Sequence, residues 1–94
     1  MNFNLKKEWF EKINRGEKTH EYRLFNDYWN ARIPKLKKGD IITFCKGYPK
    51  SDDNDSRLTA IIEKIDIDIG LKTDLKVLEY VWDIEFRLLR GRVK

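Results

Sequence analysis

The chain has 94 residues, of which 40% are hydrophobic and 13% aromatic, so it can build one compact core and is expected to form a single domain over residues 1–94. One cysteine and one histidine exclude a disulfide scaffold and a zinc site, so we expect no metal and no cofactor. The absence of a long apolar run or signal-like start predicts a cytoplasmic protein with no membrane partner. The net charge of +4 comes from the first half of the chain, which suits a phosphate-bearing partner.

The first elements alternate between helix and strand. Leu5, Trp9 and Ile13 recur at helical spacing, which predicts an amphipathic helix over residues 5–15 with Gly16 at its C-terminal end. Residues 18–25 read as a strand. Its period of two places Glu21 and Arg23 on one face, with Thr19 and Phe25, and His20, Tyr22 and Leu24 on the other.

The middle of the chain predicts a short helix followed by two strands. Asn26 is a suitable N-cap for a helix that ends before Pro34. Residues 41–45 form a buried strand, and a polar loop over residues 50–56 precedes a long strand over residues 57–69. Near the end of that strand the isoleucines alternate with aspartates, so we expect Ile65, Ile67 and Ile69 to face inward.

The last part predicts one or two helical turns from Thr73 to Leu78 and a final strand over residues 81–89. This order of elements indicates an α+β domain on a curved sheet of about five or six mostly antiparallel strands, with two or three short helices. Residues 90–94 are a basic tail, which is expected either to be a frayed end or to add electrostatic contact with RNA.

The stretch Gly16–Arg23 is the most informative part of the sequence. Glu21 and Arg23 share a strand face, so a carboxylate and a guanidinium could present acceptors and donors to the edge of a base. Lys18 is out of phase with that face and needs the turn at Gly16 to reach the same cleft. The alternative is a structural ion pair between Glu21 and Arg23 at the start of a strand.

The pattern Gly-x-Lys-x-x-Glu-x-Arg after an amphipathic helix resembles the signature of ASCH domains, relatives of the PUA fold. The resemblance continues through Tyr28-Trp29 with Arg32, residues 39–42, Gly47-Tyr48 and residues 83–86. It implies a small, partly open β-barrel with a Lys/Glu/Arg cleft that binds RNA, a nucleotide or a nucleoside. Lys18, Glu21 and Arg23 would line this cleft, with Arg32 and Tyr48 at its rim.

One branch of this family removes the acetyl group from N4-acetylcytidine, so the resemblance also implies a possible amidohydrolase. Lys18 would then be the base or nucleophile, and Glu21 would orient it or act as an acid. In that branch a threonine stands at the position of Glu21. A second acid lies on a helical excursion that this chain shortens to roughly residues 72–79.

Several other residues have both a structural and a functional interpretation. Arg32 either reaches the cleft or bonds the end of its own helix, and Tyr48 either stacks on a base or is an ordinary loop residue. His20 and Cys45 are expected to be packed or surface residues. A third functional hypothesis is a protein-interaction module that uses an acidic outer face, formed by Asp66, Asp68, Asp83 and Glu85.

Overall fold

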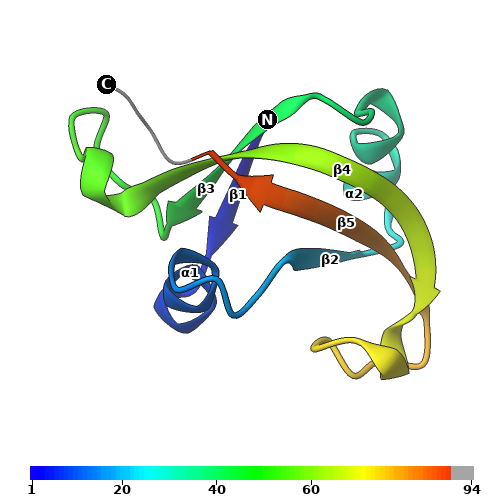
Figure 1. Cartoon of the computed structure of the whole chain (residues 1–94). Coiled ribbons are helices and arrows are strands. Elements are labelled where there is room, and N and C mark those ends of the chain that lie inside the picture. The colour runs from blue at the N-terminus through cyan, green and yellow to red at the C-terminus, as the bar shows by residue number, and fades with distance from the viewer. Residues whose placement is uncertain (90–94) are drawn as a thin grey trace.

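In the computed structural model, which describes residues 1–89, five strands form one curved sheet in the order β1-β3-β4-β5-β2 (Figure 1). The strands are β1 (Asn2–Leu5), β2 (His20–Leu24), β3 (Ile41–Lys46), β4 (Arg57–Ile69) and β5 (Tyr80–Leu88). The β1–β3 pairing is parallel and the other three pairings are antiparallel. The predicted α+β class is confirmed, and the sheet is mixed and open because its edge strands, β1 and β2, do not pair with each other.

Strand β1 is the element that the sequence pattern did not predict. Helix α1 (Lys7–Asn14) begins two residues after Leu5, which lies in β1 and was wrongly included in the helix. The stripe that predicted the helix is nevertheless real, because Phe10 and Ile13 are buried on its inner face. Its C-terminal end is followed by Gly16 in the left-handed conformation, at φ +79°.

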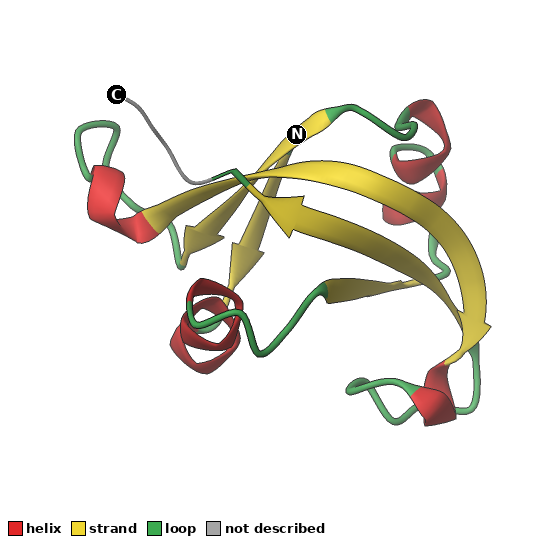
Figure 2. Ribbon diagram, in the orientation of Figure 1, coloured by secondary structure: helices red, strands yellow, loops and turns green. Residues whose placement is uncertain are grey.

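Short helical segments connect the remaining strands (Figure 2). Helix α2 (Asp27–Asn30) begins as expected at Asn26, whose side-chain oxygen accepts a hydrogen bond of 2.9 Å from the backbone N–H of Trp29. Three-residue 3-10 helices cover Ile33–Lys35, Asn54–Ser56 and Gly70–Lys72. No helix among residues 1–89 is long and apolar enough to cross a membrane.

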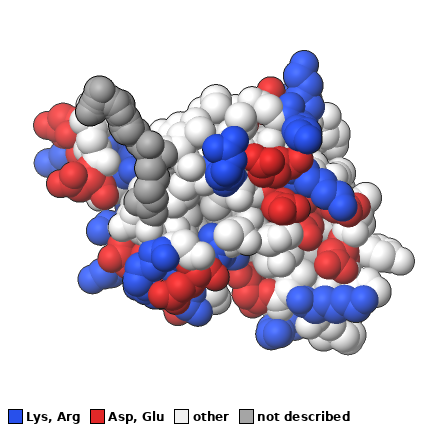
Figure 3. Space-filling view, in the orientation of Figure 1, with Lys and Arg blue, Asp and Glu red and all other residues white. Residues whose placement is uncertain are grey.

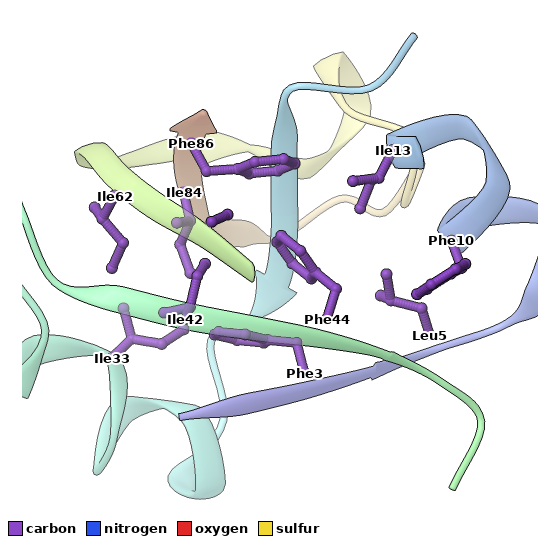
Figure 4. Packing of buried hydrophobic residues seen from close by; sticks show 11 residues of the cluster. Phe3, Leu5, Phe10, Ile13, Ile33, Ile42, Phe44, Ile62, Ile84 and Phe86 are labelled. Atoms are coloured by element: carbon purple, nitrogen blue, oxygen red, sulfur yellow. The ribbon is translucent and has the colours of Figure 1, made fainter. Parts of the chain in front are cut away.

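The hydrophobic core lies on the concave side of the sheet, between the strands and α1 (Figure 4). Phe44 contacts both Phe3 and Phe86, at ring-centroid distances of 6.0 and 4.7 Å. Strands β1, β3, β4 and β5 each contribute buried apolar side chains to this cluster, whereas β2 contributes none among the described residues. In the buried position of β2 stands Glu21, which is only 6% exposed.

Two predictions for the second half of the chain are wrong. Ile67 and Ile69 do not face the core, since the far end of β4 extends beyond it and leaves them 51% and 45% exposed. Residues 73–78 form no α-helix; a 3-10 turn ends at Lys72 and an irregular loop follows, in which Lys76 adopts a positive φ of 53° that is incompatible with a helix. The expected basic tail, residues 90–94, lies outside the described residues.

Candidate functional site

Strand β2 directs its charged face toward the gap between the two sheet edges. Glu21 is paired with Ile84 and Arg23 with Trp82 on β5, so both charged residues share the face that carries the core. Arg23 reaches across the gap, because its Nη2 donates a hydrogen bond of 3.3 Å to the backbone oxygen of Asn4 on β1. A cleft therefore lies where the sheet fails to close.

Glu21 is held between two cations. Its Oε2 accepts a hydrogen bond of 2.6 Å from Arg23 Nη2, and its Oε1 lies 3.5 Å from Lys18 Nζ. All three side chains are largely removed from water, with exposed fractions of 8% for Glu21, 8% for Lys18 and 18% for Arg23. A carboxylate buried to this extent is tolerated only when it is paired and hydrogen-bonded, as it is here.

Lys18 joins this group from outside the strand. It precedes β2, and after the left-handed turn at Gly16 its ammonium group lies 5.4 Å from the ring centre of Trp9 and 5.1 Å from that of Tyr22. Two aromatic faces therefore add cation–π contacts to the ion pair with Glu21. The three residues that the sequence motif predicted to line a cleft therefore meet in one place: Lys18, Glu21 and Arg23.

A second carboxylate, that of Asp74, completes the cluster. Its Oδ2 lies 2.5 Å from Lys18 Nζ, and its side chain is 29% exposed. Sequence reasoning did not identify this residue because the contact spans 56 positions of the chain. The sequence feature that could have indicated Asp74 is its position in the shortened segment, residues 72–79, where the family resemblance expects a second acid.

The loop that carries Asp74 is held by Gly70 and Thr73. A Cβ atom at Gly70 would lie 2.4 Å from Val77 Cγ2 and 2.6 Å from the Val77 carbonyl oxygen, so only glycine fits at this close approach. The Thr73 hydroxyl donates to the Gly70 carbonyl at 2.8 Å and accepts from the backbone N–H of Leu75 at 3.2 Å. These contacts place Asp74, between Thr73 and Leu75, opposite β2.

Arg23 is supported by aromatic rings. Its guanidinium carbon lies 4.9 Å from the ring centre of Trp29 and 5.1 Å from that of Phe3, and these two rings stack at 5.4 Å. Its buried Nε has no hydrogen-bond acceptor within residues 1–89. Trp29 therefore belongs to the edge of the core and at the same time forms a wall of the cleft.

The cleft encloses about 420 Å³. Its walls include Trp9, Tyr22 and Trp29, and its polar groups are those of Lys18, Glu21, Arg23 and Asp74. This combination of flat aromatic surface with a few convergent charged groups is typical of sites for small planar ligands.

Tyr22 stays neutral over the physiological pH range. Burial raises the pKa of its phenol, and the nearby carboxylates of Asp83 and Asp74 raise it further because they oppose a second negative charge. The phenol therefore remains an O–H donor beside the cleft.

Arg32 and Tyr48 do not line the cleft. Arg32 donates a hydrogen bond of 2.7 Å to the backbone oxygen of Tyr28 and lies 3.6 Å over its ring, which is the structural role that the sequence left open. Tyr48 is 89% exposed in the turn after β3. Cys45 is buried in β3, and His20 bonds Asp83 on β5, with 2.7 Å between Nδ1 and Oδ1.

The proposed acidic face is partly compensated. Asp83 is paired with His20. The backbone N–H of Ile67, together with Lys64 at 3.4 Å, lowers the pKa of the Asp66 carboxyl. Figure 3 shows acidic and basic side chains beside one another over the visible face rather than a uniformly acidic surface. No group of three or more His, Cys, Asp and Glu side chains arranged to hold a metal ion occurs in residues 1–89.

The solved structure of hypothetical protein PH0355 has a similar fold. It aligns with a TM-score of 0.60 over 94% of this chain and 97% of that chain, at 19% sequence identity. At this identity the likeness concerns the fold alone. No protein-family model and no curated protein matches the sequence.

Proposed function

We propose that this chain is a small ASCH-type domain of the PUA-like class that binds RNA or a nucleotide in the cleft between β1 and β2. One observation carries the proposal: Lys18, Glu21 and Arg23 converge within hydrogen-bonding or ion-pair distance in a hollow with aromatic walls. The open sheet is compatible with the partly open barrel that the family resemblance implies. The proposal assigns the protein to the cytoplasm, where such ligands are present.

The chemistry of the cleft suits a nucleobase. Lys18 and Arg23 offer N–H donors and Glu21 and Asp74 offer acceptor oxygens, so the hydrogen-bonding edge of a base has partners of both kinds. Trp9 and Trp29 provide flat apolar surface, and stacking of a base on an aromatic side chain is worth about 1–3 kcal/mol. The buried ion pairs keep these groups in place before a ligand arrives, which lowers the entropy cost of binding.

Tryptophan fluorescence tests this proposal directly, because Trp9 and Trp29 both line the cleft. Titration with the common nucleosides, their 5′-monophosphates and short single-stranded RNA should quench the emission saturably. Asp74→Asn should weaken binding about tenfold, the loss expected for one charge-assisted contact. Lys35→Ala removes an exposed lysine outside the cleft and should leave binding unchanged. Absence of binding by every ligand would refute the proposal.

A second candidate function is hydrolysis of N4-acetylcytidine or a related acylated nucleoside. The contact of Lys18 with Asp74 favours it, because the hydrolase branch uses a lysine and a second acid, and Asp74 lies in the segment where that acid is expected. Water would add to the acetyl carbonyl, the bond between that carbon and N4 would break, and acetate and cytidine would leave.

The residues of the cluster have roles in this reaction that balance the proton. The Asp74 carboxylate takes a proton from the attacking water and gives it to the departing N4, while the Lys18 ammonium group holds Asp74 in place. Glu21 orients Lys18, and Arg23 holds the carbonyl oxygen as negative charge develops on it. Incubation with N4-acetylcytidine and chromatography for cytidine tests the reaction. Turnover that disappears in Asp74→Asn supports it, and a substrate that is bound but never cleaved excludes it.

A further inference from the structure

A second hollow, of about 340 Å³, adjoins the cleft. Trp9, Lys18, Tyr22 and Asp74 line both spaces, so the bridge between Lys18 and Asp74 forms part of their common boundary. The second hollow lies between the end of α1, the start of β2 and the loop after β4.

Positive charge is in excess around this second hollow. Of its two acidic residues, Asp74 is bound to Lys18 and Glu17 is bound to Arg15, with 2.5 Å between Arg15 Nε and Glu17 Oε2. Lys12 and Lys72 also line the hollow, and neither has a carboxylate oxygen within 4.0 Å among residues 1–89. These two ammonium groups are available to an anion from outside.

Several hydrogen-bond donors, charged and uncharged, surround the second hollow. Lys12 is held against the wall by the ring of Trp9, at 4.9 Å from its centre. His20 uses Nδ1 in its bond to the Asp83 carboxylate, which leaves Nε2 for another partner. Thr19, an exposed residue that carries a hydroxyl group, lines the same space. This set of donors matches the acceptor oxygens of a phosphate, which lysine commonly binds as a point charge.

We propose that the second hollow binds the phosphate of the same ligand whose base occupies the cleft. The inference rests on the proposed function and narrows it, because it makes the preferred ligand a phosphorylated nucleotide rather than a free nucleoside. Since the two hollows adjoin across one layer of side chains, a single nucleotide spans them, with its sugar over the Lys18–Asp74 bridge. The phosphate is either a monoester, as in a free nucleotide, or a diester within RNA.

The test compares three kinds of ligand with three proteins. The ligands are cytidine, cytidine 5′-monophosphate and a short cytidine-rich single-stranded RNA. The proteins are the wild type, the double variant Lys12→Ala/Lys72→Ala and a control of equal charge, Lys35→Ala/Lys38→Ala, in which both lysines are exposed and lie outside both hollows. Circular dichroism verifies that each variant is folded, as expected for exposed side chains.

The double variant should lose about tenfold in affinity for the phosphorylated ligands, should show a smaller dependence of affinity on salt by about one unit of slope per lysine, and should bind cytidine as the wild type does. A loss for the monophosphate identifies the monoester, and a loss for RNA alone identifies the diester. Equal affinity of the wild type for cytidine and both phosphorylated ligands overturns the inference and leaves the proposed function intact. No binding of any ligand refutes the proposed function itself.

Discussion

The two sides of the buried layer exclude water by opposite means. On β3, Phe44 is fully buried against Phe3 and Phe86, and packing alone stabilises it. On β2, Glu21 is almost as deeply buried, but it depends on contacts with Lys18 and Arg23. The difference arises because β3 lies inside the sheet, whereas β2 is an edge strand beside the gap where charged side chains meet. Burial alone therefore does not distinguish core from site in this protein.

Removal of the Phe44 ring tests the apolar side and should have the largest effect. Phe44→Ala should lower the free energy of unfolding by about 4 kcal/mol, because it combines lost apolar burial with a cavity. Urea denaturation followed by circular dichroism measures the loss. Tyr48→Ala, at a site that is 89% exposed, is the control and should change stability by less than about 0.5 kcal/mol.

Removal of the Glu21 carboxylate tests the charged side. Glu21→Ala should cost about 3 kcal/mol, because it leaves the largely buried Arg23 guanidinium without a carboxylate partner and Lys18 with Asp74 alone. Denaturation of Glu63→Ala provides the contrast: Glu63 pairs with Arg87 at 3.1 Å on the surface, and its loss should cost less than about 1 kcal/mol. Equal losses of stability in the two variants would show that the buried Glu21 ion pairs contribute no more than a surface pair.

A methyl group added at Gly70 tests the loop after β4, which presents Asp74 to the cleft. Gly70→Ala should cost about 2 kcal/mol through overpacking and should weaken ligand binding, because the loop presents Asp74. The added change Val77→Ala should not restore stability. It removes Cγ2 but leaves the Val77 carbonyl oxygen, at 2.6 Å from the new Cβ. Thermal unfolding of the single and double variants measures both effects, and full recovery in the double variant would contradict this explanation.

The smallest expected effect is on the titration of Tyr22, whose side chain lines both the cleft and the second hollow. Since burial and nearby carboxylates raise the pKa of Tyr22 in the folded protein, its tyrosinate should appear later than about pH 10, the usual value. Any stability that Tyr22 contributes is complete below that pH and is lost as the pH rises through the raised pKa. Ultraviolet absorbance of tyrosinate follows the titration. Tyr22→Phe should remove this late component, and Tyr48→Phe should retain it.

Local patterns in the sequence predicted much of the fold. Strand β4 follows the predicted range, residues 57–69, and Asn26 caps α2 as its residue type suggests. The alternation in β2 correctly placed Glu21 and Arg23 on one face. These features follow from periods of two or 3.6 residues and from caps, which depend on neighbours in the chain.

Contacts between distant parts of the chain decided the rest. Strand β1 exists because Phe3 and Leu5 align with Phe44 and Lys46 in a parallel pairing, which no pattern in four residues reveals. Ile67 and Ile69 alternate like core residues, yet the core ends before them. The cluster shows both contributions: the sequence determined that Lys18, Glu21 and Arg23 share one short stretch, while only the tertiary structure brought Asp74 to Lys18, because an ion pair acts through space and not along the chain.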